Sequence, residues 1–375
     1  MSDPTPMLQR LSLSGFKTVR RLDALELGMM NLLIGPNGAG KSNLISFFRL
    51  LNRMATPPGN LQLFVAKAGG ASTLLHNGSA FTQDICSDLV FAAPLGWREY
   101  GFRLSYAAQD TLIFAQEQIT RSHEHERGCD DSRLSMGSGH RESHLIYAND
   151  IDIRHMTEGL QGFFADCLVY QFHNTSETAR IRQRWSVTDN RSLKEDGANL
   201  APFLLRILQQ HPPHYQRITS TLRQIASYFA DFVLEPEGDS VLLRWREIGS
   251  DIVFGPHQAS DGTLRAMALI ALLMQPTAEM PSIIILDEPE LGLHPRAIAV
   301  LAGLLQAASL HRQVIVATQS SVLLDHFEPE QVIVGEREGS ESVFRRLDRY
   351  KLESWLEEFT LSDLWDKNVL GGRPH

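Results

Sequence analysis

The sequence predicts an α/β fold, with a mixed β region toward the N-terminus, a parallel sheet flanked by helices, and a short helical insertion. Two observations lead to this prediction. A short apolar run, Asn31–Ile34, ends in glycines and is followed from Lys41 by apolar residues at helical spacing. Two further apolar runs, Ile283–Leu286 and Val314–Ala317, alternate with helical patterns. Continuous apolar strands that alternate with helices are typical of a parallel sheet covered on both faces.

The N-terminal part of the chain is expected to be mainly β. Residues 60–120 favour strands over helices, whereas residues 121–146 are polar and rich in Gly, Ser and His. This polar segment is expected to form a surface loop or a disordered insertion. Strands are expected at Leu11–Phe16, Ala24–Leu27, Arg103–Tyr106, Thr111–Phe114 and Cys167–Tyr170.

The remainder changes from a helical arm to an α/β pattern. Strands resume at Val241–Trp245, before the two apolar runs near the C-terminus. Helices are expected at Leu200–Leu208, Tyr215–Phe229, Leu264–Met274, Arg296–Ala308 and Leu352–Phe359. The chain is therefore expected to divide into an N-terminal lobe (residues 1–175), a helical arm (176–235), a C-terminal lobe (236–345) and a helical tail (346–375).

Composition limits the class of protein. The 375 residues suffice for one large domain or two modest ones. The net charge of −9 excludes a wholly basic surface and leaves a local basic groove open. Three cysteines make a disulfide framework or a four-thiolate zinc site implausible. The N-terminus lacks a signal-peptide pattern, and the longest apolar run, Ala266–Met274, is too short for a bilayer. A cytoplasmic protein without membrane contact is expected.

A glycine-rich loop provides the strongest chemical signal. The segment from Gly35 to Ser42 fits G-x-x-x-x-G-K-[ST] at every fixed position, between a strand and a helix. Glycines let backbone N–H groups surround phosphate oxygens, and the helix adds the positive end of its dipole. Lys41 is expected to reach the β- and γ-phosphates of ATP and to serve catalysis, and the Ser42 hydroxyl to bind Mg²⁺. The expected nucleotide-binding residues are Gly35, Pro36, Asn37, Gly38, Ala39, Gly40, Lys41, Ser42 and Asn43.

The apolar run Ile283–Leu286 ends in two carboxylates. A buried parallel strand delivers Asp287 to the carboxyl edge of the sheet, where α/β proteins bind ligands. Asp287 is expected to hold Mg²⁺, mostly through water, and Glu288 to orient or deprotonate the attacking water. The alternative is a pair of acids that cap the next helix. A complete phosphate loop elsewhere in the chain favours the catalytic interpretation.

Four segments in chain order resemble the motifs of ABC-type ATPases of the SMC, RecF and OLD branch. Gly35–Ser42 resembles Walker A, Ala259–Arg265 the signature loop, Leu286–Pro289 Walker B, and Glu290–Pro295 the D-loop. Leu168–Asn174 stands where this branch has its Q-loop. Within the branch, the chain most resembles small stand-alone bacterial ATPases without a nuclease domain, through the runs LDEPELGLHP and VLGGRP.

The resemblance implies an ABC-type P-loop ATPase head with a composite site. In this class two protomers face head to tail, and the signature loop of one caps the nucleotide held by the other. Ser260, Asp261 and Gly262 are therefore expected to bind the partner's ATP, and Gln171 to contact the nucleotide or Mg²⁺. Ser260 as an ordinary helix cap and Gln171 as a polar strand-end residue stay open as alternatives. An ATP-dependent homodimer is expected, and larger assemblies stay open.

One residue departs from the pattern of these relatives. Most of them carry a histidine after the strand that follows Walker B, and Gln319 takes its place here. An amide can donate a hydrogen bond to a phosphate oxygen, but it carries no charge. We therefore expect Gln319 to act at the catalytic site with weaker γ-phosphate sensing, and hydrolysis to be slow.

Two groups of polar residues admit a functional and a plain interpretation. The histidines and cysteine of the polar segment could bind a metal, but their spacing matches no compact zinc template, so a solvated loop is expected. These residues are His123, His125, Cys129, His140 and His144. The basic residues at the base of the arm could meet DNA phosphates, although no aromatic or base-reading pattern accompanies them. They are Arg180, Arg182, Arg184, Arg191 and Lys194.

The resemblance leaves three functions to compare. The first is an ATPase whose dimer closure serves DNA maintenance or anti-phage defence, with a separate effector such as a small nuclease or toxin. The second is a slow scaffold that assembles or restrains such an effector without acting on DNA. The third is the nucleotide-binding subunit of a membrane transporter. The SDGT signature and the separation of 246 positions from Lys41 to Asp287 speak against the third.

Overall fold

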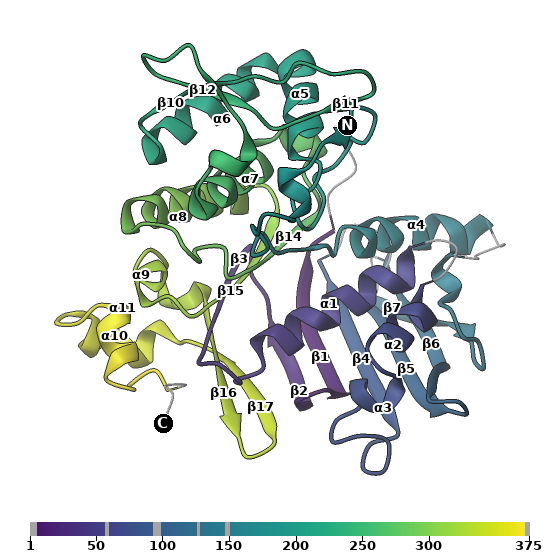
Figure 1. The fold of residues 1–375 in the computed structure, drawn as a ribbon. Coiled ribbons are helices and arrows are strands. Elements are labelled where there is room, and N and C mark those ends of the chain that lie inside the picture. The colour runs from purple at the N-terminus through teal and green to yellow at the C-terminus, as the bar shows by residue number, and fades with distance from the viewer. Residues whose placement is uncertain (1–5, 57–59, 93–98, 126–127, 147–150, 372–375) are drawn as a thin grey trace.

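The computed structural model describes residues 6–56, 60–92, 99–125, 128–146 and 151–371 (Figure 1). For residues 121–125, 128–132, 151–156 and 158 it describes the backbone alone. Within these ranges, two six-stranded sheets organise the chain, and helices pack on both.

The first sheet is antiparallel and belongs to the N-terminal part of the chain. Its strands follow the order β2-β1-β4-β5-β6-β7, so most neighbours in space are also neighbours in sequence. Their bounds are β1 (Leu8–Phe16), β2 (Val19–Glu26), β4 (Asp84–Phe91), β5 (Glu99–Ala107), β6 (Thr111–His125) and β7 (Gly128–Gly137). The helices beside it are α1 (Lys41–Ala55), α2 (Leu61–Lys67), α3 (Ala71–Leu74), η1 (His144–Ile146) and α4 (Ile151–Ala165).

The second sheet carries the chain's parallel strands. Its order is β17-β16-β3-β15-β14-β8, with every neighbouring pair parallel except β16 with β17. The bounds are β3 (Met30–Ile34), β8 (Val169–Tyr170), β14 (Ile283–Asp287), β15 (Gln313–Thr318), β16 (Val332–Glu338) and β17 (Glu341–Arg346). The expectation of an α/β fold with a mixed β region and a parallel sheet is confirmed.

Helix α1 is fixed between the two sheets. Successive residues of a strand point to opposite faces, so Leu33 faces α1 while Leu32 and Ile34 face the other side. Phe47 of α1 stacks on Phe102 of β5 with ring centroids 6.3 Å apart. The same core holds buried side chains of β14, β15 and β16. This shared packing fixes the start of α1 relative to the carboxyl ends of the parallel strands.

The other face of the parallel sheet is covered by the signature helix and its neighbours. These are α7 (Asp261–Met274), α8 (Pro295–Ser309) and α9 (Ser321–Leu324), whose buried side chains join one core with those of α5 (Leu200–Gln210) and α6 (Pro212–Ile225). Small strands complete this part, namely β9 (Trp185–Ser186), β10 (Phe229–Phe232), β11 (Ser240–Val241), β12 (Trp245–Glu247) and β13 (Val253–Phe254). Single 3₁₀ turns are η2 (Arg180–Arg182), η3 (Pro256–Gln258), η4 (Thr277–Glu279) and η5 (Pro329–Gln331).

The C-terminal segment packs two short helices, α10 (Arg349–Leu356) and α11 (Leu361–Asp366), beside α9 (Figure 1). Thr360 caps α11 by accepting from the Asp363 backbone N–H while the Asp363 carboxylate accepts from the Thr360 N–H. Among the described helices, none combines the length and apolarity that a membrane crossing requires.

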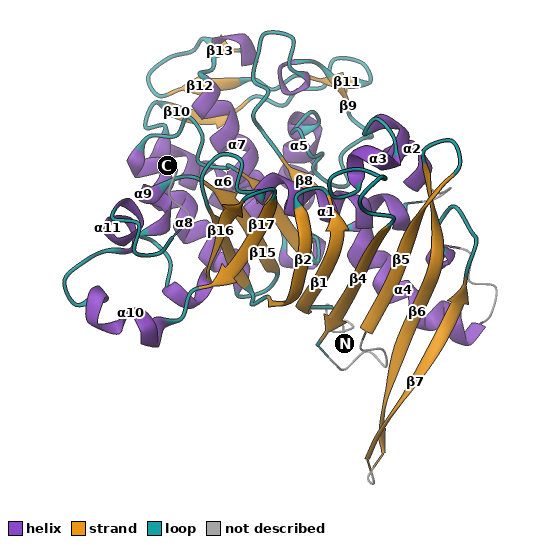
Figure 2. Cartoon of the chain, turned by 90° about the horizontal axis from the view of Figure 1, so that it is seen from below, coloured by secondary structure: helices purple, strands orange, loops and turns teal. Residues whose placement is uncertain are grey.

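Two expectations need correction, and a third needs an addition. Residues 121–146 are not a loop throughout, because β6 and β7 pair from Glu117 with Gly137 to His125 with Gly128. Figure 2 shows both strands running on past the ends of β4 and β5. Ladder hydrogen bonds join backbone groups, so polar side chains do not prevent strand pairing. The side chains of His123, His125 and Cys129 lie outside the described residues.

The other two points concern helices. Residues 60–120 are mainly β, as expected, and they also contain α2 and α3. The helix expected through Phe229 ends at Ile225, where Ala226 leaves the helical region, and Phe229 lies on β10. A phenylalanine four residues beyond a helix end continues the helical period by chance, so periodicity alone could not locate the boundary.

Candidate functional site

The phosphate loop lies between the carboxyl end of β3 and the first turn of α1. Gly38 and Gly40 take φ values of +83° and +96°, a conformation that favours glycine. A Cβ on Gly35 would lie 2.5 Å from the Gly335 carbonyl oxygen on β16. The first turn of α1 contains no acidic residue. The loop's backbone therefore faces an uncompensated helix N-terminus, which attracts an anion.

Lys41 is buried at the base of this loop. Its ammonium donates hydrogen bonds to the carbonyl oxygens of Gly35 and, at 3.1 Å, Pro36. Burial lowers the pKa of Lys41, and the nearby charges of Glu288, Asp287 and Glu290 partly offset this effect. The lysine is thus held inside the loop by carbonyls that an anionic phosphate can displace as partners.

Two acidic residues leave the carboxyl end of β14 in different environments. Asp287 is 7% exposed, and Gln171 after β8 donates a hydrogen bond to its Oδ2. Burial raises the pKa of Asp287, while the Gln171 hydrogen bond acts in the opposite direction. Glu288 turns away with φ of +45°, and its N–H donates to the Ala317 carbonyl at 2.8 Å. Because of this left-handed turn, the two carboxylates point in different directions.

Gln319 contacts Glu288 directly. Its Nε2 donates a hydrogen bond to Glu288 Oε1 across the carboxyl ends of β14 and β15. The two side chains line one cavity of about 280 Å³ together with the phosphate loop. The loop residues of this lining are Pro36, Asn37, Gly38, Gly40, Lys41, Ser42 and Asn43. A phosphate chain in this cavity would meet backbone donors, a cation and a carboxylate at once.

Arg337 also lines the cavity and was missed by sequence reasoning. It lies on β16, and its Nε donates to the Gly339 carbonyl at 3.0 Å. Its position depends on the pairing of β16 with β3, which leaves no local signal in the sequence. A second cation beside the loop strengthens the attraction for a polyphosphate.

The signature residues lie outside this cavity. Ser260 caps α7 by accepting a hydrogen bond from the Thr263 N–H at 3.2 Å, as expected of an ordinary helix cap. Both Ser260 and Asp261 are exposed. A Cβ on Gly262 would lie 2.6 Å from the Gly292 carbonyl of the expected D-loop. The structure therefore brings together Walker A, Asp287, Glu288, Gln171 and Gln319, but not the signature loop of the same chain.

Two arginines tie the signature loop to its neighbours. Arg182 is buried and donates to the carbonyls of Thr175, Pro256 and Ala259, with its Nη2 3.0 Å from Asp261 Oδ1. Arg265 donates to the carbonyls of three other residues: Phe172 at 3.1 Å, His173 at 3.0 Å and Leu291 at 2.6 Å. The Q-loop, signature helix and D-loop segments are thus cross-linked by side chains.

The basic residues at the base of the arm are largely neutralised. Ion pairs join Arg180 to Asp196 at 2.8 Å, Arg184 to Glu237 at 2.6 Å and Lys194 to Asp189 at 2.9 Å. With Arg182 bound to Asp261, four of the five basic residues named from the sequence face an acid. This pairing removes most of the net positive charge that a phosphate-binding patch needs.

The fold is that of an ABC-type P-loop ATPase head of the SMC kind. A family model described as "AAA domain, putative AbiEii toxin, Type IV TA system" matches residues 30–325, and the chain belongs to this family. No curated protein matches the chain.

Solved SMC heads share the fold. An SMC head bound to the C-winged helix domain of ScpA aligns with a TM-score of 0.61 at 14% identity, over 92% of this chain and 99% of that chain. An SMC head with an extended coiled coil, bound to the C-terminal domain of ScpA, from Pyrococcus furiosus, gives 0.58 at 14% identity, over 94% and 99%. A head with coiled coil and joint from Pyrococcus yayanosii gives 0.54 at 12% identity, over 94% and 99%.

Proposed function

We propose that this chain binds and hydrolyses ATP with Mg²⁺, closes as a head-to-tail homodimer around two nucleotides, and thereby controls a separate effector in defence against foreign DNA or in DNA maintenance. One observation carries the proposal. The phosphate loop, Glu288 and Gln319 line one cavity, and Asp287 lies beside them at the carboxyl edge of a parallel sheet.

The donor atoms near this cavity fit Mg²⁺. Ser42 lines the cavity, and the buried Asp287 is the last residue of β14. Both are hard oxygen ligands, which Mg²⁺ prefers to nitrogen or sulfur. The bound cation would neutralise charge on the phosphates and on Asp287. Gln171, through its hydrogen bond to Asp287, would orient that carboxylate.

Glu288 is the proposed general base. Its carboxylate lines the phosphate cavity, and Gln319 holds one of its oxygens through a hydrogen bond. The other oxygen can accept a proton from an attacking water or orient it. Lys41 would exchange its carbonyl partners for phosphate oxygens, and Arg337 would add charge at the same wall. The uncharged Gln319 favours slow turnover, because a neutral donor stabilises developing negative charge less than a cation does.

The exposed signature loop supports a site completed by a partner. Ser260→Arg should abolish ATP turnover by blocking closure while nucleotide binding persists, because the substituted side chain is on the surface and outside the cavity of its own protomer. Mixing Ser260→Arg with Lys41→Ala should restore part of the turnover, since their heterodimer contains one intact composite site. Ser220→Arg, at an exposed serine of α6, is the control and should keep full turnover. Turnover that stays absent in the mixture would contradict completion in trans.

A scaffold that restrains an effector without acting on DNA is the second candidate. The ion pairs of the arm's basic residues favour this candidate, and so does the toxin named in the description of the family. On this basis we expect slow ATP turnover that linear duplex DNA does not raise, at low or moderate salt. Steady-state phosphate release, with Lys41→Ala as the blank, measures it. Salt-sensitive stimulation by DNA would instead support the DNA-acting form of the proposal.

A further inference from the structure

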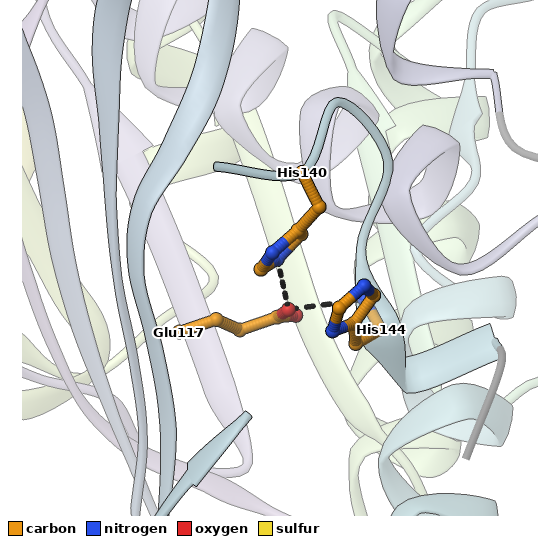
Figure 3. Close-up of side chains that lie close together, drawn as sticks. All are labelled: Glu117, His140 and His144. Atoms are coloured by element: carbon orange, nitrogen blue, oxygen red, sulfur yellow. Dashed lines mark hydrogen bonds and ion pairs between the residues drawn. The ribbon is translucent and has the colours of Figure 1, made fainter. Parts of the chain in front are cut away.

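A second cluster of potential ligands lies in the N-terminal sheet, outside the nucleotide site. Glu117 of β6, His140 after β7 and His144 of η1 converge (Figure 3). One ligand atom from each lies within 4.8 Å of the others. Sequence reasoning assigned both histidines to a solvated loop, whereas His140 pairs with Phe114 through a β-bridge and its side chain is 10% exposed.

Glu117 is a fully buried carboxylate that is held in one orientation. Its Oε1 accepts hydrogen bonds from Tyr100 Oη at 2.7 Å and from the Ser143 hydroxyl. Its Oε2 lies 2.8 Å from His140 Nε2 and accepts from the His144 N–H at 3.0 Å. Burial raises the pKa of Tyr100 well above its ordinary value, with Glu117 as a second cause, so the phenol stays a donor. Among the ion pairs of the described residues, His140 is the partner of this carboxylate.

Of the two histidines, His144 is oriented as a ligand by a hydrogen bond, whereas His140 Nε2 would have to give up its proton and its contact with Glu117 to bind a metal. His144 Nδ1 lies 2.6 Å from the Met136 carbonyl, so it carries the proton and leaves the Nε2 lone pair available. Metal-binding histidines typically make such a hydrogen bond through the nitrogen that does not bind the ion. His140 Nδ1 is buried and has no hydrogen-bond partner within the described part of the chain. Hydrogen bonds to protein therefore leave this cluster incomplete.

We propose that Glu117, His140 and His144 bind a divalent transition-metal ion of the zinc class. Two imidazoles and one carboxylate are a donor set that suits Zn²⁺, with water as the fourth ligand. Zinc bonds of about 2.0–2.1 Å in a tetrahedral site place ligand atoms roughly 3.3 Å apart, so the 2.8 Å contact between Glu117 Oε2 and His140 Nε2 must lengthen on binding. The histidine rings are stacked, with centroids 3.8 Å apart and planes at 14°, so at least one ring turns out of the stack to aim its lone pair at the ion.

The ion would join the segment after β7 to strand β6 of the sheet. His140 and His144 belong to that segment, and Glu117 belongs to β6. Helix α4, which packs on η1, also packs on α1. Metal binding would thus stabilise the lobe that carries the phosphate loop, since a ligand that binds the folded state alone raises its stability.

The test is Zn²⁺ binding to the tag-free full-length protein without nucleotide, in competition with a chromogenic chelator. We expect one equivalent to bind, and His144→Gln to weaken binding on the order of 100-fold. His311→Gln, at an exposed histidine after α8, is the matched control and should bind as the wild type does. Equal affinity of the wild type and His140→Gln/His144→Gln would overturn the proposal.

Cobalt substitution provides a second measurement that does not depend on a variant folding. Co²⁺ in a four-coordinate site of nitrogen and oxygen ligands absorbs visible light far more strongly than the hexaaquo ion. We expect this absorption in the wild-type protein, with a melting temperature raised by on the order of a few degrees. A wild-type protein without the visible band would show that Glu117 and His140 form a hydrogen-bonded pair that takes no metal.

Discussion

Lys41→Ala should reduce ATP turnover on the order of 10²–10³-fold, to the background of the assay. Lys41 is the cation at the base of the phosphate loop, and its ammonium is held by the carbonyls of Gly35 and Pro36. Alanine removes the charge that meets the β- and γ-phosphates and leaves the backbone N–H groups of the loop. Phosphate release and binding of a fluorescent ATP analogue measure the two effects separately.

The control for this substitution is Lys351→Ala, because the Lys351 side chain is 82% exposed and pairs with Asp348 on the surface. This variant should retain turnover. Circular dichroism shows whether Lys41→Ala stays folded, which we expect because two hydrogen bonds lost from one side chain cost about 1–3 kcal/mol. A folded Lys41→Ala protein with wild-type turnover would refute the assignment of the phosphate site.

Glu288→Gln should bind ATP and accumulate as a closed dimer while turnover falls on the order of 10²–10⁴-fold. Glutamine has nearly the shape of glutamate, and its carbonyl oxygen can still accept the hydrogen bond from Gln319 Nε2. The amide cannot take a proton from water, so the nucleotide that closes the dimer is not consumed.

Light scattering after size exclusion, with ATP and Mg²⁺ present, measures the mass of this variant. Glu353→Gln makes the same chemical change at an exposed residue of α10, and that protein should turn over ATP as the wild type does. A Glu288→Gln protein that binds ATP yet remains a monomer would exclude the sandwich mechanism and leave nucleotide binding intact.

The sequence supports local inferences well. The fixed positions of the phosphate loop demand a strand before it and a helix after it, and the structure has β3 and α1 there. The apolar run before Asp287 has four residues and is followed directly by an acid pair, which favours a short buried strand over a helix. Such motifs require a particular local backbone conformation. Their strands and helices could therefore be predicted without knowing which other strands they pair with.

Features made by distant pairing could not be inferred in this way. Arg337 reaches the phosphate cavity through the pairing of β16 with β3, and Glu117 meets His140 through the register of β6 and its neighbours. The polar segment after Thr120 has few apolar residues, so hydrophobic periodicity gave no strand signal. Its strands are specified by a ladder of backbone hydrogen bonds, to which every residue except proline can contribute.

The place of β3 in its sheet determines when the nucleotide site can exist. β3 is made within the first 34 residues, yet it lies between β15 and β16, which begin at Gln313 and Val332. During synthesis, this strand therefore waits for nearly the whole chain before either edge is paired. Non-local pairing of this kind slows folding and leaves an apolar strand exposed to aggregation. The arrangement also prevents truncated chains from forming the nucleotide site, because a chain that stops short of β15 cannot assemble the sheet that supports the phosphate loop.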